Sequence, residues 1–252
     1  WYDAEDDASK QLKFHTQTAG QSLTAQQPLN NIVRVTIQAL AGVMGGTQSL
    51  HTNSYDEALA LPSEEAVRIA LRTQQIIAEE SGAADSVDPL GGSFLVESLT
   101  EEVEEEAMEY IESIKEMGDG SVRDGVLTGI DEGFFHREIQ EASYEYQERV
   151  DDEEEVVVGV NKYVSEEDTS PEVLHVDEEV AEHQRERLAS VKEERDDAAV
   201  EDALGDLREA IENDENVMPY IVTAVKAYAT MGEIMDVFEA EYGEYREKIG
   251  LA

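Results

Sequence analysis

Residues 30–52, NNIVRVTIQALAGVMGGTQSLHT, decide the fold of this chain. Apolar residues recur at helical spacing through the first two thirds of this stretch, and Gly45-Gly46 ends the pattern. Residues 47–52 then alternate in the way that a short strand does. The stretch therefore predicts a helix followed by a strand, with Asn30 or Asn31 as the helix cap.

The same alternation of strand and helix continues on both sides. Residues 13–18, KFHTQT, predict an earlier strand, and Ser63 is a typical N-cap for a helix that Ser81-Gly82 ends. Residues 86–92 predict a third short strand and tight turn, before a long helix over 93–117. This order predicts βα units and a parallel sheet. Four residues line the predicted buried face of the helix after Ser63: Val67, Leu71, Gln74 and Ile77.

Beyond residue 117 the pattern changes. The expected elements are a glycine-punctuated segment (118–133), a helix (134–150), two short apolar strands (156–160 and 173–176) and two closing helices (178–213 and 216–245). Thr230 and Glu233 have the spacing of a capping box. We expect two domains: residues 1–117 with about three βα units, and residues 118–252 as a mostly helical extension with two short strands.

Acidic side chains avoid one segment. The chain has 60 Asp and Glu against 18 Lys and Arg, for a net charge of −42. Residues 14–62 nevertheless hold only two acids, Asp56 and Glu57, and one Lys or Arg, Arg34. Such sparing is typical of a buried or catalytic region, whereas we interpret the acids elsewhere as a halophilic, solvated surface.

Composition excludes several kinds of site and partner. The chain has no cysteine, which excludes disulfides, thiolate metal sites and thiol nucleophiles. Its negative charge disfavours nucleic acid as a partner, and no apolar run approaches the roughly 18 residues of a membrane helix. The histidines outside residues 14–62 lack ligand spacing, so no metal site is predicted. Without a visible signal peptide, we expect a soluble cytoplasmic protein.

Polar side chains near two predicted strands are the candidate site. We place His15 at the carboxyl end of its strand, where it and Gln17 would share a face and polarise a carbonyl group; the alternative is a satisfied core histidine. Gln48 is equivalent on the next strand, or else bonds to a neighbouring loop. Asn53 and Glu57 combine an amide with a carboxylate, as ribose sites do, or form a loop that caps its own helix.

Two long strings carry a family resemblance. Residues 15–34 read HTQTAGQSLTAQQPLNNIVR, and residues 45–62 read GGTQSLHTNSYDEALALP. Both closely resemble the cobalamin-dependent acyl-CoA mutases. Shorter matches follow in family order: QQIIAEESG (74–82), VDPLGGSF (87–94), VVVGVNKYV (156–164) and TMGEIMDVFEAEYGEYRE (230–247). One departure is Gln21, which stands where many members have Trp.

The resemblance implies an α/β fold, in which this chain is the C-terminal portion of a (β/α)₈ barrel followed by a mainly helical linker region. In such proteins coenzyme A enters along the barrel axis and adenosylcobalamin lies across the mouth. The implied activity is an isomerase that interconverts methylmalonyl-CoA and succinyl-CoA by radical rearrangement. Relatives that act on isobutyryl-, ethylmalonyl- or hydroxyisobutyryl-CoA remain alternatives, as does a non-catalytic barrel subunit that supports assembly.

The resemblance also assigns roles to residues. His15 and Gln17 match family residues near the substrate and corrin face, and Gln48 matches a glutamine at the radical-transfer region. Asn53 and Glu57 match the residues that hold the adenosyl ribose. The base-off cobalamin signature Asp-x-His-x-x-Gly does not occur in the chain.

These matches and absences imply partners. We expect a separate cobalamin-binding subunit or domain to supply the lower cobalt ligand, and a hetero- or homo-oligomer in which this chain is the C-terminal part of a large catalytic subunit, inactive alone. A module that recruits basic partners through its charge is a third hypothesis, and its association would have to persist at high salt.

Overall fold

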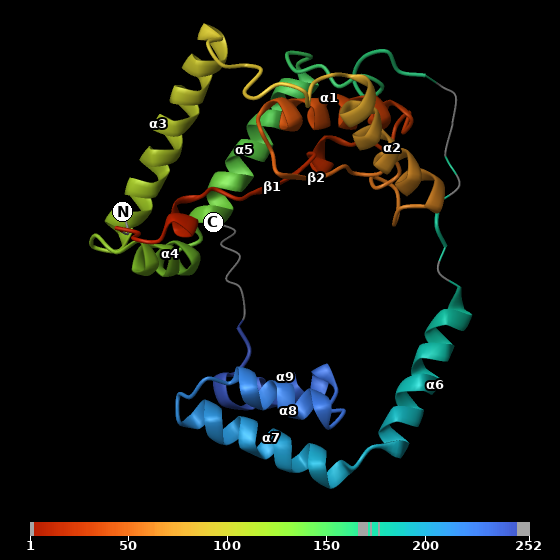
Figure 1. The fold of residues 1–252 in the computed structure, drawn as a ribbon, viewed down its shortest axis with the longest axis vertical. Helices are drawn as coiled ribbons and strands as arrows, with labels where there is room; N and C mark the ends of the chain where they lie inside the picture. Colours follow the sequence, from red (N-terminus) through yellow and green to blue (C-terminus); the bar gives the residue numbers. More distant parts are fainter. Residues whose placement is uncertain (1–2, 166–170, 172, 176, 246–252) are drawn as a thin grey trace. The chain divides into compact units, whose positions relative to one another are not determined.

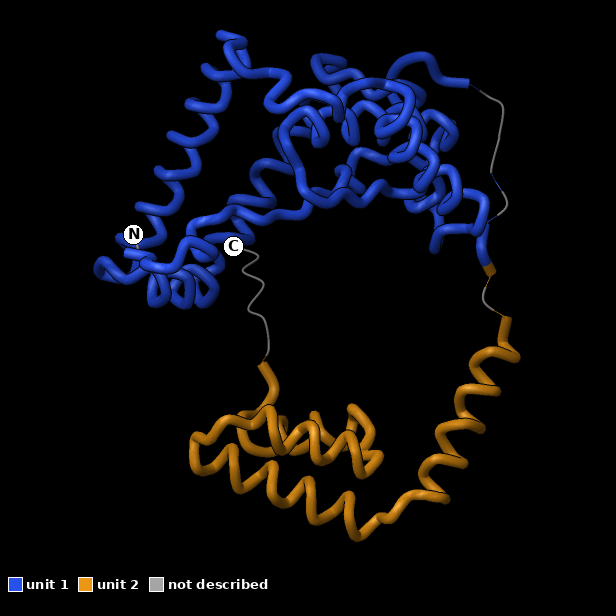
Figure 2. The backbone as a smooth tube through the Cα atoms, viewed as in Figure 1, with its two compact units in different colours: residues 1–174 blue, residues 175–252 orange. Residues whose placement is uncertain are grey.

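The computed structural model of the chain describes residues 3–165, 171, 173–175 and 177–245. Figure 2 shows its division into two compact units, residues 1–174 and 175–252. The predicted boundary after residue 117 separates a barrel portion from a helical extension. The division into compact units does not test that boundary. The boundary therefore stays a prediction.

A parallel pair of strands forms the sheet of the first unit. Strand β1 (His15–Gln17) pairs with β2 (Ser49–His51), and helix α1 (Asn30–Met44) connects them (Figure 1). The strand–helix–strand unit predicted from residues 13–52 is thereby confirmed, although each strand has only three residues. Two 3₁₀ turns flank β1, η1 (Asp7–Lys10) and η2 (Gly20–Ser22).

The predicted asparagine cap of α1 is wrong. Leu29 occupies the N-cap position and makes no side-chain cap bond. Asn31 lies inside the first turn instead and is fully buried. Its carboxamide is held by other segments of the chain, so it is not available to the helix end.

Helix α2 (Glu64–Glu80) begins where predicted but buries a different face. Ser63 Oγ accepts a hydrogen bond from the amide of Ala66, which confirms the N-cap. Of the predicted face Ile77 is buried and Gln74 half-buried, whereas Val67 and Leu71 are each 50% exposed. The buried face consists of Ala66, Ala70, Thr73 and Ile77. Small side chains bring the α2 backbone close to the sheet, where Thr52 Oγ1 donates to the Ala70 carbonyl at 2.8 Å.

The third predicted strand is also wrong. Residues 86–92 form consecutive turns, in which the amide of Gly91 donates to the carbonyl of Asp88 and that of Ser93 to the carbonyl of Leu90. Asp88 and Gly92 both have positive φ, which an extended strand does not allow. The local turn chemistry therefore prevails over the short apolar run.

Three helices follow in the first unit: α3 (Phe94–Met117), α4 (Val122–Asp131) and α5 (Phe134–Asp151). Both long helices were predicted, but the glycine-punctuated segment 118–133 contains the unpredicted α4. Gly125 lets α4 lie against the end of α3, because a Cβ there would collide with the Ile114 carbonyl. Tyr110 Oη of α3 donates to Glu138 Oε2 of α5 at 2.6 Å.

The two predicted strands after α5 are absent from the described residues. Residues 156–160 form a turn with one isolated bridge, between Val158 and Lys162. The turn bonds to α1 and to the loop before it, since Arg34 Nη2 donates to the Val158 carbonyl at 2.7 Å. Residues 173–175 have no regular structure, and Val176 lies outside the described residues. A lone strand gains little without a sheet edge to pair with.

The second unit contains α6 (Glu178–Glu194), α7 (Asp197–Glu212), α8 (Met218–Lys226) and α9 (Met231–Tyr242). Each of the two predicted closing helices is thus divided in two. The capping box at Thr230 and Glu233 is confirmed. Side chains of α7, α8 and α9 form the core of this unit: Ala203, Leu207, Ile211, Ala224, Ile234 and Val237.

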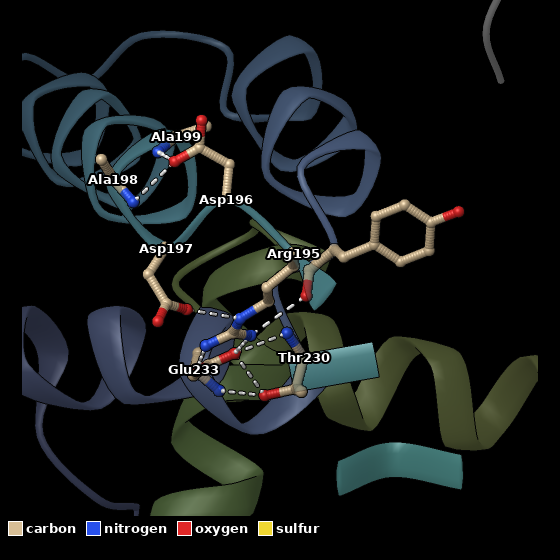
Figure 3. Close-up of polar contacts among 8 residues, drawn as sticks. Arg195, Asp196, Asp197, Ala198, Ala199, Thr230 and Glu233 are labelled. Atoms are coloured by element: carbon tan, nitrogen blue, oxygen red, sulfur yellow. Dashed lines mark hydrogen bonds and ion pairs between the residues drawn. The ribbon is translucent and has the colours of Figure 1, made fainter. Parts of the chain in front are cut away.

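The side chain of Arg195, which is only 9% exposed, connects the break between α6 and α7 to α9. Figure 3 shows Arg195 donating to both carboxylate oxygens of Glu233, at 2.7 and 2.8 Å. Its Nε donates to Asp197 and its Nη1 also to the Tyr228 carbonyl. These contacts raise the pKa of Arg195 and lower that of Glu233.

None of the helices in the described part of the chain is both long and apolar enough to cross a membrane.

Candidate functional site

The parallel register of β1 and β2 sorts their side chains onto two faces. Paired residues lie on the same face, so His15 stands beside Ser49 and Gln17 beside His51. All four side chains are exposed. The opposite face turns toward α1, which packs on β2. The strands therefore present one open face made of polar groups.

His15 and Gln48 border the same hollow. His15 Nδ1 lies 2.6 Å from Ser49 Oγ, and Gln48 Oε1 accepts a hydrogen bond from the Phe14 amide at 2.9 Å. The hollow has a volume of about 490 Å³, is open to solvent and is also lined by Lys13. Because His15 is exposed, the reading of a satisfied core histidine is wrong, whereas Gln48 does bond to the neighbouring chain segment.

His15 does not lie where the sequence placed it along the strand. It is the first residue of β1, not its carboxyl end. Gln48 likewise precedes β2, while Asn53 and Glu57 follow the end of that strand. The structure therefore brings His15 together with Gln48 and, separately, Asn53 with Glu57. Glu57 is not among the residues that line the hollow beside His15.

Asn53 and Glu57 form a bonded polar corner with Thr18. Thr18 Oγ1 donates to Asn53 Oδ1 at 2.6 Å and accepts from the Asn53 amide at 3.0 Å. Asn53 Nδ2 then donates to Glu57 Oε2 at 2.5 Å, and the Ser54 amide donates to Glu57 Oε1 at 2.7 Å. Both carboxylate oxygens thus have a fixed direction. Gly20 approaches closely, since a Cβ there would lie 3.3 Å from Asn53 Nδ2.

Glu57 retains acceptor capacity in this arrangement. A carboxylate has about four lone-pair sites, and two of those on Glu57 are used by the contacts above. Glu57 is half-buried, whereas Asn53 is buried. The alternative, a loop that caps its own helix, is wrong for this pair, because Ser63 caps α2 while Asn53 and Glu57 bond within their loop and to Thr18.

Sequence reasoning missed the buried supports of this corner. Asp56 is fully buried; its Oδ2 accepts from the Ser63 amide at 2.8 Å, and its Oδ1 has no hydrogen-bond partner among the described residues. Burial, then Glu65 and Asp56, raise the pKa of Tyr55. Asn31 reaches the Tyr55 carbonyl. The available signal was that Asp56 is one of only two acids in residues 14–62.

Within the described ranges, no three His, Cys, Asp or Glu side chains gather closely enough to hold a metal ion. The donor set at Thr18, Asn53 and Glu57 consists instead of a hydroxyl, a carboxamide and a carboxylate. Of these three side chains only Glu57 is not buried, and its remaining lone-pair sites could accept from the hydroxyl groups of a ligand.

Comparison with known families decides what these residues belong to. The model of the methylmalonyl-CoA mutase family matches residues 1–244. The chain belongs to the methylmalonyl-CoA mutase family. The resemblance to cobalamin-dependent acyl-CoA mutases is thereby confirmed, and the match includes both compact units of this mutase-family chain.

Individual relatives of this mutase-family chain carry two kinds of name. It is 45% identical over 249 residues to the 2-hydroxyisobutanoyl-CoA mutase large subunit of Aquincola tertiaricarbonis, covering 98% of this chain and 43% of that protein. It is 46% identical over 237 residues to the mitochondrial methylmalonyl-CoA mutase of Mus musculus, covering 93% and 31%. For the methylmalonyl-CoA mutase of Escherichia coli strain K12 the identity is 43% over 247 residues, covering 97% and 34%. The chain thus spans less than half the length of these relatives.

Proposed function

We propose that the chain is part of a catalytic subunit that interconverts methylmalonyl-CoA and succinyl-CoA with adenosylcobalamin. The observation that carries this proposal is the family match over residues 1–244, together with relatives of that name at 43–46% identity. The polar open face of the strands and the bonded corner at Glu57 supply groups suited to the reaction. In this proposal the chain is a C-terminal portion of the barrel and its helical extension.

His15 and Gln17 would hold the substrate. Ser49 Oγ lies within hydrogen-bond distance of His15 Nδ1, and if the serine hydroxyl donates there, the ring proton lies on Nε2. His15 could then donate from Nε2 to the thioester carbonyl. Gln17 lies on the same exposed face two residues further on. A carboxamide donor at that position would fix the orientation of the same acyl group.

Asn53 and Glu57 would hold the ribose of the adenosyl group. Vicinal hydroxyls donate to a carboxylate, and the two oxygens of Glu57 are held by the Ser54 amide and Asn53 Nδ2 before any ligand arrives. When bound, adenosylcobalamin supplies the radical chemistry of the rearrangement. The residues of this chain would orient the reacting groups and, in the assembled enzyme, exclude water. Gln48, which lies beside His15 and bonds to the Phe14 amide, would act at the radical-transfer region.

Partners follow from the same proposal. The acyl-CoA is the substrate, and a separate cobalamin-binding subunit or domain supplies the lower cobalt ligand. The relatives are more than twice as long as this chain, which leaves ample length for further barrel strands and such a domain. We therefore expect the working enzyme to be a hetero- or homo-oligomer.

A second substrate is favoured by a specific observation. The relative named as a 2-hydroxyisobutanoyl-CoA mutase large subunit is as similar to this chain as the methylmalonyl-CoA mutases are. Assays of the complete enzyme should therefore offer both acyl-CoAs. Turnover of 2-hydroxyisobutanoyl-CoA alone would replace the first substrate by the second and leave the reaction class unchanged.

Glu57→Gln tests the proposed role of the polar corner in the complete enzyme. Asn53 Nδ2 and the Ser54 amide bond to different oxygens of Glu57, and glutamine replaces one of these oxygens by an NH₂ donor, so one of the two groups loses its acceptor. Hydrogen bonds to charged groups are worth about 1.5–3 kcal/mol, so we expect adenosylcobalamin affinity and turnover to fall by about tenfold to 100-fold. Glu64→Gln, an exposed change in the first turn of α2, is the matched control.

Equilibrium dialysis with adenosylcobalamin and a coupled assay of acyl-CoA turnover give the two readouts. A Glu57→Gln enzyme that binds and turns over like the control would favour the non-catalytic barrel subunit. A wild-type enzyme that rearranges neither acyl-CoA would reject the proposed activity as a whole.

A further inference from the structure

A buried asparagine connects two loops at the start of α1. Asn31 Nδ2 donates to the Thr24 carbonyl and to the Tyr55 carbonyl, both at 2.9 Å. Its Oδ1 accepts from the Thr24 amide at 3.1 Å and from Arg34 Nη1 at 2.8 Å. The side chain has no exposed surface. Two donors and one acceptor oxygen are all in use, so the carboxamide has a single orientation.

Arg34 holds that carboxamide from the other side. It is the one Lys or Arg in residues 14–62. Its guanidinium donates to three neutral oxygens: Thr24 Oγ1, Asn31 Oδ1 and the Val158 carbonyl. Among the described residues it forms no ion pair, in a chain that has 60 acidic side chains. The planar fork of donors thus serves geometry rather than charge neutralisation.

The turn at residues 156–164 is itself braced against this region. Gln27 Nε2 donates to the Tyr163 carbonyl at 3.0 Å, and the Gly159 amide donates to the Lys162 carbonyl at 2.7 Å. Asn161 Nδ2 bonds to carbonyls at the end of α5 and just beyond it. Gly159 has φ +86°, and a Cβ there would lie 3.1 Å from Gln27 Cδ. Only glycine fits this turn without displacing it.

We propose that Arg34 and Asn31 are positioning residues, which fix the loop that carries Asn53 and Glu57 by tying it to the turn at residues 156–164. Tyr55, whose carbonyl Asn31 holds, lies midway between Asn53 and Glu57. The loop is also bonded at Thr18 and at Ser63, so Asn31 supplies the support between these two anchors. The assignment of this loop to the adenosyl group rests on the proposed function. Its positioning by Arg34 does not.

In this arrangement the turn at residues 156–164 acts through its backbone carbonyl at Val158, which helps to position the loop with Glu57. A ligand-binding carboxylate loses much of its effect when displaced by about 1 Å, because hydrogen bonds are steeply directional. Val158 is connected to Tyr55 through the side chains of Arg34 and Asn31. Each of these two side chains is held by hydrogen bonds at its polar end. A segment about 100 residues away in sequence thereby sets the register of the Glu57 loop.

Arg34→Met tests the proposal because it keeps the aliphatic stem and removes the three hydrogen bonds of the guanidinium. Hydrogen exchange measured by mass spectrometry on the full chain should show faster exchange at the Ser54 and Glu57 amides, which bond inside the loop. In the complete enzyme, the Kd for adenosylcobalamin should rise about tenfold while the KM for acyl-CoA stays unchanged. The matched control is Arg68→Met, which removes an exposed arginine from α2.

Gly159→Ala perturbs the turn at residues 156–164, which lies at the other end of the connection, and leaves Arg34 unchanged. It should speed exchange at the same two amides, and combining it with Arg34→Met should add little further. Additive effects of the two changes would overturn the link between the turn and the loop.

Two further outcomes would also overturn the proposal. One is unchanged exchange at Ser54 and Glu57 in Arg34→Met. The other is a lower melting temperature in which KM and Kd deteriorate together, as a purely structural role would give. If wild-type enzyme fails to bind adenosylcobalamin, the proposed function fails, but the exchange measurement still decides whether Arg34 positions the loop.

Discussion

At the scale of single residues, two arginines of this acidic chain, Arg34 and Arg195, each bond to several separate segments. Arg195 is nine-tenths buried, and its planar group is shared between Glu233, Asp197 and the Tyr228 carbonyl. Glu233 also accepts from the Thr230 amide and hydroxyl, so one carboxylate serves both an ion pair and a helix cap. The break between α6 and α7 is therefore fastened to the start of α9 by two side chains.

Glu233→Gln should make the second unit less stable in a pH-dependent way. The Arg195 guanidinium first, and then the Thr230 amide, hold the pKa of Glu233 well below its usual range. A carboxylate of this kind adds stability above its unfolded pKa of about 4.3, and loses it as pH falls toward the lower folded pKa. At pH 7 we expect the variant to melt several degrees below wild type, with a gap that closes progressively below about pH 4.5.

Differential scanning calorimetry of the full chain across this pH range gives the measurement. Glu239→Gln, an exposed change on the same helix, should show no such pH-dependent gap. A gap between Glu233→Gln and wild type that stays constant down to pH 3 would contradict the assigned role of the ion pair.

At the scale of elements, helical glycines have opposite effects depending on what they face. Gly125 in α4 allows the crossing with α3, because a Cβ there would enter the Ile114 carbonyl. Gly205 in α7 has nothing within 4 Å of the equivalent position. Both are interior helix positions, so differences in intrinsic helix propensity largely cancel between them.

Gly125→Ala and Gly205→Ala should therefore change stability in opposite directions. We expect Gly125→Ala to lower the free energy of unfolding by more than about 2 kcal/mol, since backbone must move. Gly205→Ala should raise it by about 0.5–1 kcal/mol through helix propensity and a less flexible unfolded chain. Urea denaturation followed by circular dichroism measures both. Stabilisation by Gly125→Ala would show that α3 and α4 do not cross closely.

These glycines also explain which elements the sequence could predict. The helix caps at Ser63 and Thr230 were predictable because their bonds join residues three apart. Helix α4 was not predictable, because glycines such as Gly118 and Gly125 are typical of loops. Their role in the close packing of α3 and α4 is visible only in the structure. Short apolar runs such as residues 156–160 carry no information about whether a sheet edge is available to them.

The candidate site divides in the same way. Asn53 and Glu57 were predictable as a pair, because they lie four residues apart in one loop and bond directly. Asn31 was read as a helix cap because its partner at Tyr55 is 24 residues away. Long-range hydrogen bonds of buried amides leave no periodic signal, so sequence reasoning found Asn53 and Glu57 as a candidate pair and missed the buried Asn31 that bonds to their loop.

At the scale of the whole molecule, acidic residues are unevenly distributed: only two of the 60 lie in residues 14–62, which contain the candidate site. The acids of α3 show the surface pattern, since the five glutamates between residues 101 and 106 are all exposed. Strands β1 and β2, which precede the loop with Glu57, contain no acidic residue. Mutual repulsion among surface carboxylates opposes the compact state, and it weakens as the Debye length falls from about 10 Å at 0.1 M salt to about 3 Å at 1 M.

Thermal stability of the chain should therefore rise with ionic strength. We expect the melting temperature to increase by several degrees or more between 0.1 M and 2 M KCl, because a net charge of −42 is increasingly screened. Replacing Glu101, Glu102, Glu104 and Glu105 by glutamine should raise stability in dilute buffer and flatten this dependence. Salt can also stabilise a protein by strengthening apolar burial, and the glutamine variant would keep that effect. A weaker dependence on salt in the variant would therefore be due to charge screening. Equal melting temperatures in dilute and concentrated KCl would show that the acidic surface does not oppose folding, and would remove the physical basis for a salt-adapted protein.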